Sequence, residues 1–262
     1  MHDPLQEWWR RVFVEYADEY LALHRKRLDA LAEKQAFYLH GLLKYMERRR
    51  NDRYIRLLDV PCGYGRLSKH LLSLGYDVTG VDISEKFIDI ARTECRDGKF
   101  VLADMRKLPF QDESFDAVLN IFASFGYFSD QENEQVLREF ARVLRVGGLL
   151  IMDLVNGEWL RRHFEERSLA EDENYFIVYQ RRLEWPRMYE KVVAYRKKGR
   201  EAEEGLEPYV IFSHYVRLYT PDELAALAER HNLVLLEALE SWTIKRLDRQ
   251  RSPQMLLVFM KV

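Results

Sequence analysis

Residues 4–50 carry a helical pattern. Apolar side chains recur there at helical spacing with charges between them, namely Leu28, Leu31, Tyr38, Leu42 and Tyr45. No glycine occurs before Gly41, so nothing earlier in the stretch interrupts a helix. We therefore expect an N-terminal helical cap over residues 1–53, whose apolar side packs against the segment that follows.

From Tyr54 onward the pattern alternates between strands and helices. Runs rich in leucine and β-branched residues predict strands over residues 54–60, 76–82, 100–103, 115–122 and 149–154. Helical segments separate most of them, over residues 67–74, 84–95 and 130–144. Strands that alternate with helices form a parallel sheet covered on both faces, with right-handed crossovers. The alternation predicts a doubly wound α/β fold.

Residues 157–216 break the alternation. Segments rich in Tyr, Val, Ile and Phe predict antiparallel strands over residues 174–185, 189–198 and 209–218. The earlier pattern then resumes with a capped helix and two strands, over residues 220–231, 234–239 and 255–262. We therefore expect one α/β domain, made of residues 54–156 and 217–262, that carries an antiparallel β insertion.

Composition argues against several classes of protein. The net charge is −2, so the chain lacks the basic footprint typical of a nucleic-acid-binding protein. Its two cysteines, Cys62 and Cys95, are too few for a metal set or a disulfide framework, and we expect no metal. No apolar run approaches the roughly 20 residues that span a bilayer, and the first residues lack the features of a secretory signal. We therefore expect a soluble, cytoplasmic protein with no membrane partner.

Acids and glycines stand at the ends of successive predicted strands. Asp59 ends the first strand and the turn Gly63-Tyr64-Gly65 follows it, while the next three strands end at or near Asp82, Asp104 and Asn120. Because ligands bind at the carboxyl ends of parallel strands, we expect these residues to converge on one pocket. Glycines let the backbone approach a ligand closely, and carboxylates accept hydrogen bonds from hydroxyl and amino groups.

The order of these residues fits an adenosine with a cationic tail. Asp82 can accept hydrogen bonds from both ribose hydroxyls, and Ile83 after it offers an apolar surface to adenine. Asp104 can accept from an exocyclic amino group while the Met105 amide donates to a ring nitrogen. Asp59 suits a sulfonium and an ammonium but opposes a pyrophosphate. S-adenosylmethionine is therefore the expected cofactor, with S-adenosylhomocysteine as its product.

Two other interpretations stay open. An NAD-dependent oxidoreductase would use the same strand ends, although its fingerprint needs a third glycine where this chain has Ser68. A non-catalytic protein could bind S-adenosylmethionine in the same pocket. The ligand that raises the unfolding temperature tests the first alternative, and methyl transfer to any acceptor tests the second.

Five segments match the motifs of a known family in order and spacing. They are LLDVPCGYGRLS at residues 57–68, VTGVDIS at 78–84, LADMRKLPF at 102–110, FDAVLNIFASFGYF at 115–128 and VLRVGGLLIMD at 143–153. In these segments the chain resembles the class I, Rossmann-like methyltransferases that use S-adenosylmethionine. The resemblance implies a mostly parallel seven-stranded sheet with an antiparallel final hairpin, and N-terminal helices.

The same resemblance implies roles for individual residues. Gly63 and Gly65 would face the methionine part of the cofactor, and Pro61 and Asn120 belong to the same cofactor site. Tyr20 in the segment FVEYADEY would cover the cofactor. The insertion at residues 157–216 would form a lid over the substrate. The chain lacks the Asn/Asp-Pro-Pro-aromatic stretch of enzymes that methylate nucleobase amines, so the resemblance favours small-molecule methyltransferases.

Ser124, Tyr127 and His214 are the candidate catalytic residues. Ser124 and Tyr127 follow the fourth predicted strand, and His214 lies where the insertion returns to the main domain. Methyl transfer is a direct displacement, so we expect such side chains to orient the acceptor and exclude water rather than to act as a dedicated base. The expected acceptor is a small molecule with an amine, hydroxyl or carboxylate group. Cys62 is expected to be a small buried residue, and the protein is expected to be a monomer or a homodimer.

Overall fold

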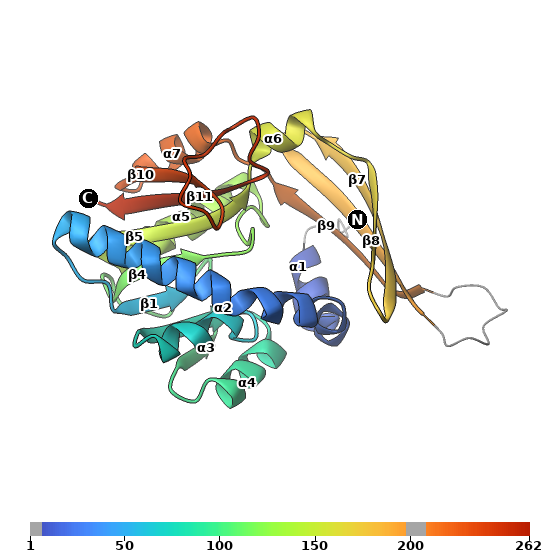
Figure 1. Cartoon of the computed structure of the whole chain (residues 1–262), viewed down its shortest axis with the longest axis horizontal. Helices are drawn as coiled ribbons and strands as arrows, with labels where there is room; N and C mark the ends of the chain where they lie inside the picture. The colour runs from blue at the N-terminus through green and yellow to red at the C-terminus, as the bar shows by residue number, and fades with distance from the viewer. Residues whose placement is uncertain (1–6, 198–207) are drawn as a thin grey trace.

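The main sheet of the protein has seven strands. The computed structural model describes residues 7–197 and 208–262 (Figure 1), and the strand order is β10-β11-β5-β4-β1-β2-β3. The strands are β1 (Arg56–Asp59), β2 (Asp77–Asp82), β3 (Lys99–Leu102), β4 (Phe115–Asn120), β5 (Leu144–Val155), β10 (Leu233–Glu240) and β11 (Gln254–Lys261). Neighbouring strands pair in parallel except that β11 is antiparallel to both β5 and β10. The predicted seven-stranded, mostly parallel sheet is confirmed.

Helices cover both faces of this sheet. α2 (Ala17–Arg50) and α3 (Arg66–Ser73) contribute to one apolar core, on one face. α5 (Asp130–Val143) and α7 (Pro221–Glu229) contribute to a second core on the opposite face. α4 (Glu85–Glu94) packs beside β2 and β3. The sheet is therefore doubly wound, and the carboxyl ends of its parallel strands remain accessible to a ligand.

Several helices begin where their capping residues predict. The Thr220 hydroxyl accepts a hydrogen bond from the Glu223 amide (3.1 Å), and the Glu223 carboxylate accepts one from the Thr220 amide (3.4 Å). Ser129 and Glu132 form the same capping box at the start of α5. The Ser84 hydroxyl accepts from an amide in the first turn of α4. These bonds satisfy amides that have no partner within the helix.

The N-terminal segment is interrupted rather than one continuous helix. α1 (Trp8–Arg10) passes directly into a π-helical turn at Arg11–Glu15, and α2 then begins at Ala17. Residues 4–6 of the predicted helix lie outside the described residues. The interruption brings aromatic side chains of this segment over the carboxyl ends of the main strands.

The buried stripe of α2 also differs from the prediction. Leu31 and Tyr45 are 43% and 51% exposed, whereas Ala32 and Ala36 are buried in the core shared with α3. Small side chains let two helices approach closely. A pattern based on large apolar residues does not reveal this requirement.

A second, four-stranded sheet is formed by the insertion. Its antiparallel strands, in spatial order, are β6 (Arg167–Glu171), β7 (Tyr175–Glu184), β8 (Arg187–Arg196) and β9 (Pro208–Arg217). The three predicted strands correspond to β7, β8 and β9. The prediction missed β6, which is largely exposed and has no apolar alternation, and it missed the short helix α6 (Gly157–Arg162). Figure 1 shows this sheet beside the main domain, with α1 between the two.

Several predicted boundaries shift, as three examples show. The strand predicted over residues 115–122 ends at Asn120, and Phe122 has a left-handed φ of 67°. The helix predicted over residues 130–144 runs straight into β5, where Gly147 has a φ of 79° and the pairing with β4 changes register. The strand predicted over residues 189–198 ends at 196, and its last predicted residue lies outside the described residues.

Main-chain and ionic contacts fasten the second sheet to the main domain. The Arg217 amide donates to the Gly126 carbonyl (2.8 Å). Arg187 and Arg217 both pair with Asp130 at the start of α5, at 2.8 Å and 3.4 Å. These contacts hold β9 next to the loop that follows β4.

Candidate active site

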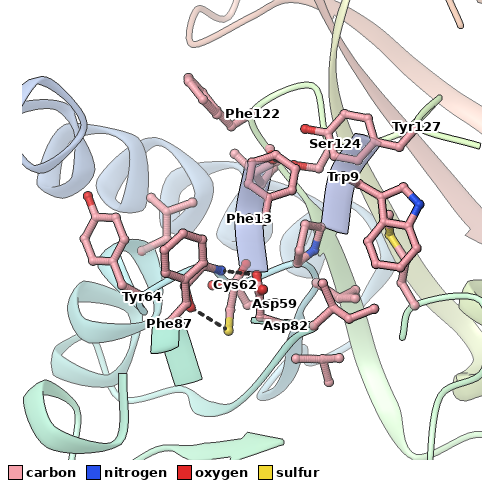
Figure 2. Close-up of a pocket in the computed structure, with 18 of the residues that line it drawn as sticks. Trp9, Phe13, Asp59, Cys62, Tyr64, Asp82, Phe87, Phe122, Ser124 and Tyr127 are labelled. Atoms are coloured by element: carbon pink, nitrogen blue, oxygen red, sulfur yellow. Dashed lines mark hydrogen bonds between the residues drawn. The ribbon is translucent and has the colours of Figure 1, made fainter. Parts of the chain in front are cut away.

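A pocket opens where the strands β1, β2 and β4 end, beneath the N-terminal helices (Figure 2). About 950 Å³ of this region is not filled by protein atoms, and that volume includes open solvent. Most of the predicted site residues contribute to its wall: Tyr20, Asp59, Pro61, Gly63, Asp82, Ile83, Asp104, Met105, Ser124 and Tyr127. Gly65, Asn120 and His214 are not part of this wall.

Asp82 at the end of β2 is buried and tied to the glycine turn. Its Oδ2 accepts from the Gly63 amide (2.8 Å) and its Oδ1 accepts from the Ser84 amide (2.9 Å). Burial raises the pKa of Asp82 to about 6, although the amides of Ser84 and Gly63 favour the charged form. Each carboxylate oxygen can accept more than one hydrogen bond. The carboxylate can therefore receive two ligand hydroxyls as well.

Asp59 at the end of β1 is a second buried acid on the same wall. The Ser68 hydroxyl donates to its Oδ2 (2.6 Å), and only 2% of the residue is exposed. Burial raises the pKa of Asp59 to about 6, and the nearby charge of Asp82 acts in the same direction. Figure 2 shows the two acids close together. A cation that enters the pocket would favour the charged form of both.

The two glycines of the turn have different surroundings. Gly63 has a φ of 55°, and a Cβ built on it meets no atom within 4 Å, so its backbone faces open space. Gly65 has a φ of 83°, and its Cβ would lie 3.1 Å from both the Ala91 Cβ and the Cys95 Sγ. Gly65 thus allows α3 to begin close to α4 and does not reach the pocket. The positive φ and this close packing both favour glycine at this position.

Cys62 within the turn is a buried side chain. Its thiol donates to the Gly63 carbonyl (3.3 Å), and burial raises the pKa of Cys62 well above its usual value. A neutral thiol is a poor nucleophile. The environment agrees with the expected role of a small buried residue.

The opposite end of the pocket contains Asp104 and Met105, which follow β3. Arg106 binds the Asp104 carboxylate with its side chain (Nη2 to Oδ2, 2.6 Å) and with its amide (2.8 Å). The same guanidinium lies 4.5 Å from the Phe128 ring centroid and 5.3 Å from that of Trp9. The guanidinium is thus held between the Asp104 carboxylate and two aromatic rings, while Asp104 still lines the pocket.

Aromatic rings line the side of the pocket near the second sheet. The ring centroids of Phe13 and Tyr20 are 5.2 Å apart, and those of Phe13 and Tyr127 are 5.8 Å apart. Burial raises the pKa of Tyr20 to about 12 and raises that of Tyr127 as well, so both phenols stay neutral. The Ser124 hydroxyl donates to the Ile121 carbonyl (2.8 Å), which closes the turn after β4. Figure 2 shows Ser124 and Tyr127 together, across the pocket from Tyr64.

Asn120 and His214 do not line the pocket, and each has a partner within the protein. The Asn120 side chain is fully buried, and its Nδ2 donates to the Val60 carbonyl (2.8 Å), which joins the ends of β4 and β1. His214 on β9 packs against the Trp8 ring at 5.1 Å and lies 3.4 Å from the Glu190 carboxylate. Burial lowers the pKa of His214. Trp8 therefore stands between this histidine and the pocket-lining Tyr127, to which it also packs.

Arg66 is a wall residue that the prediction missed. It occupies the first turn of α3, its Nη1 donates to the Gln35 Oε1 (2.5 Å), and it lies 5.5 Å from the Phe122 ring centroid. Burial lowers the pKa of Arg66, and no carboxylate among the described residues forms an ion pair with it. The sequence offered one signal for Arg66, namely a cationic side chain directly after the glycine turn. The pocket aromatics Trp9 and Phe13 were also missed, because only Tyr20 of the N-terminal segment was assigned to the site.

The described residues show neither a metal-binding cluster nor a membrane-spanning helix. Within residues 7–197 and 208–262, no group of His, Cys, Asp or Glu side chains is arranged to hold a metal ion. None of the helices in this part combines the length and the hydropathy that crossing a bilayer requires.

Comparison with known proteins agrees with this geometry. Residues 57–148 match the family described as a methyltransferase domain. Demethylmenaquinone methyltransferase from Thermotoga maritima is 34% identical over 146 residues, which are 50% of this chain and 62% of that protein. The chain thus spans less than two thirds of this relative.

Solved structures share the fold over nearly the whole chain. An S-adenosylmethionine-dependent methyltransferase from Clostridium acetobutylicum has a TM-score of 0.76 at 17% identity and covers 94% of this chain and 98% of its own. A sugar N-methyltransferase from a Streptoalloteichus species has a TM-score of 0.68 at 20% identity and covers 100% and 95%. The chain thus resembles a methyltransferase domain over residues 57–148 and shares its fold with solved S-adenosylmethionine-dependent methyltransferases.

Proposed function

We propose that this protein is an S-adenosylmethionine-dependent methyltransferase whose acceptor is a small molecule. The observation that carries the proposal is the pair of buried carboxylates, Asp59 and Asp82, on the wall of a mostly aromatic and apolar pocket. Burying such charges is costly unless a cation or hydrogen-bond donors approach them. Ribose hydroxyls and a cationic tail supply both, so the residues present fit this cofactor.

Each part of the cofactor has a proposed partner. Asp82 accepts from the ribose hydroxyls, and Asp104 with the Met105 amide holds the edge of adenine. The open space at Gly63 accommodates the methionine chain. Arg66 has guanidinium N–H groups that are not used by Gln35, and these suit the carboxylate of that chain.

The same charges disfavour a dinucleotide. Two unit charges about 4 Å apart interact by roughly 4 kcal/mol at an effective dielectric constant near 20. A pyrophosphate beside Asp59 and Asp82 would meet this repulsion, whereas a sulfonium would gain a similar attraction. We therefore rank an NAD-dependent oxidoreductase below a methyltransferase.

The residues around the transferred group would act by position. Bound S-adenosylmethionine supplies an activated methyl group that the acceptor takes by direct displacement, leaving S-adenosylhomocysteine. Phe13, Tyr20 and Tyr127 exclude water from this step, and an aromatic face near a cationic centre stabilises it by about 0.5–2 kcal/mol. The Ser124 oxygen can still accept a hydrogen bond and so help to orient the acceptor.

A small-molecule acceptor follows from the surroundings of the pocket. The second sheet stands beside the aromatic side of the pocket, and we propose that it acts as a lid over the acceptor. The names of the Thermotoga and Streptoalloteichus proteins describe a quinone precursor and a sugar as acceptors of those enzymes. The net charge of −2 gives no electrostatic reason to expect a nucleic acid. An amine, a hydroxyl or a carboxylate remains the proposed acceptor group.

Ligand-dependent unfolding tests the cofactor. At 100 times its dissociation constant, S-adenosylmethionine or S-adenosylhomocysteine should stabilise the protein by about 2.7 kcal/mol, and NAD should not. Asp82→Asn should abolish most of this gain, whereas Asp77→Asn, on the exposed first residue of the same strand, should retain it. Stabilisation by NAD alone, or equal loss in both variants, would contradict the assignment.

Isotope transfer tests the activity. The protein is incubated with small-molecule extracts and with S-adenosylmethionine labelled in its methyl group, and the products are analysed by mass spectrometry. A labelled product that requires the intact protein supports a methyltransferase. Tight cofactor binding without any labelled product would instead favour a non-catalytic binding protein.

A further inference from the structure

The loop after β4 begins with a strained backbone. Phe122 and Ala123 have φ angles of 67° and 52°, so two successive residues with side chains occupy the left-handed region. Left-handed backbone is unfavourable for such residues because the Cβ approaches the following carbonyl oxygen. It persists only where surrounding contacts enforce it, and it is concentrated at functional sites.

Asp153 on β5 supplies those contacts. Its Oδ2 accepts from the Phe122 amide (3.2 Å) and its main-chain oxygen accepts from the Ala123 amide (2.9 Å). The Ser241 hydroxyl donates to its Oδ1 (2.7 Å) and thereby orients the carboxylate. Asp153 therefore accepts a hydrogen bond from each of the two strained amides, one with its carboxylate and one with its main-chain oxygen.

The strained loop carries the pocket wall. Phe122, Ser124 and Tyr127 contribute to the wall, whereas Asp153 is 2% exposed and does not. The loop is held at its far end because the Gly126 carbonyl accepts from the Arg217 amide (2.8 Å). A change at Asp153 would therefore reach the pocket through the course of this loop, and its charge also acts on Arg66.

We propose that Asp153 is a positioning residue: it holds Phe122 and Ala123 in the left-handed conformation and thereby sets the wall that faces the methyl acceptor. This inference rests on the proposed methyltransferase function. Asp153 does not line the pocket, and the residues proposed to hold adenosine lie on other strands. An apolar residue would fill the same volume without a buried charge, so the carboxylate is explained by the Phe122 amide and the Ser241 hydroxyl that it binds.

A rescue experiment separates this role from simple packing. Asp153→Ala removes the side-chain acceptor, and hydrogen exchange of the Phe122 and Ala123 amides should become about 10- to 100-fold faster. Ala123→Gly relieves the strain at a residue outside the pocket wall, because glycine adopts positive φ readily. In the double variant it should restore most of the protection, whereas it should change little alone. Asp153→Asn keeps one acceptor oxygen and should resemble the original protein.

Binding and turnover provide the functional readouts. The affinity for S-adenosylhomocysteine should change by less than about threefold in every variant. The kcat with the acceptor found by isotope transfer should fall about 10- to 100-fold in Asp153→Ala, and it should recover in the double variant. If Asp153→Ala does not fold, Ser241→Ala should give a smaller change in the same direction.

Unchanged exchange in Asp153→Ala, or no recovery when glycine replaces Ala123, would overturn the inference. Restored exchange without restored turnover would overturn the link to the acceptor. If the original protein fails to bind S-adenosylhomocysteine, the proposed function fails, whatever the exchange pattern shows.

Discussion

Replacing Arg66 with glutamine tests whether the pocket recognises the amino-acid part of the cofactor. In the free protein, Arg66 gives one hydrogen bond to Gln35 and forms no ion pair within the described residues. If its remaining donors bind the cofactor carboxylate, their loss removes hydrogen bonds to a charged group. Such bonds contribute about 1.5–3 kcal/mol, which is roughly 10- to 150-fold in the dissociation constant. Glutamine retains an amide donor but has no charge, so we expect the affinity loss to be at least about 1.5 kcal/mol, the lower end of this range.

Two ligands locate the effect. S-adenosylhomocysteine carries the amino acid, whereas 5′-methylthioadenosine has the same nucleoside without it. Calorimetric titration of Arg66→Gln should show the full loss for S-adenosylhomocysteine and a change of less than about twofold for 5′-methylthioadenosine. Arg66→Lys keeps the charge but not the planar set of donors, so its affinity should fall between the two.

The affinity losses for the two ligands distinguish between the possible roles of Arg66. Equal weakening of both ligands would mean that Arg66 supports the pocket as a whole, for example through its contact with the Phe122 ring. No weakening of either ligand would place the carboxylate elsewhere. A normal cofactor affinity with a raised KM for the acceptor would assign the Arg66 charge to the acceptor instead.

Four further predictions follow from the buried acids and from His214, which does not line the pocket. Burial raises the pKa of Asp59 and Asp82 to about 6, so both acids become protonated below this pH and lose their attraction for S-adenosylmethionine. For each of the two acids, the affinity should fall by up to about tenfold per pH unit below 6, which titrations from pH 5 to 8 would measure. In the ligand-free protein a raised pKa contributes stability at low pH, and this stability is lost as the pH rises through about 6. Asp59→Asn should therefore raise the free energy of unfolding at pH 8 by at most about 3 kcal/mol, and it should not raise it at pH 4. Burial alone would raise the pKa of Asp116, but hydrogen bonds from Arg56 and its neighbours outweigh burial and hold it at about 2; Asp116→Asn should therefore cost about 1–2 kcal/mol in denaturant unfolding at pH 7 and nothing near pH 2. His214→Ala should leave the affinity for S-adenosylhomocysteine within about threefold, and a larger loss would mean that Trp8 transmits its effect to the cofactor.

The sequence predicted the position of the buried acids because topology alone determines it. Once strands and helices alternate, the carboxyl ends of adjacent parallel strands must meet at one edge of the sheet. Asp59, Asp82 and Asp104 follow three neighbouring strands, so any correct strand assignment brings them to the same pocket. Errors of one or two residues in the strand boundaries do not change this result.

Residues whose position depends on packing could not be assigned in this way. Gly65 fits the glycine pattern of a ligand turn, but its missing side chain serves the approach of α3 to Ala91 and Cys95. Asn120 stands at a strand end like the acids, yet its amide points back to the Val60 carbonyl. His214 depends on where the second sheet sits, and that is decided by contacts such as the one with Trp8. In each case the contact partner is distant in the sequence, so the pattern of strands and helices does not reveal the contact.

The charges on the pocket wall also constrain the ligand in a way that no single residue does. Asp59 and Arg66 influence each other electrostatically but form no ion pair, so they are too far apart to neutralise each other by contact. A ligand with one charge would satisfy one of them and leave the other buried and unpaired, which is costly. An amino-acid tail carries an ammonium and a carboxylate on one carbon and can meet both. Selectivity for S-adenosylmethionine over a plain nucleoside would then arise from the separation of two opposite charges, and removing either charge should reduce it.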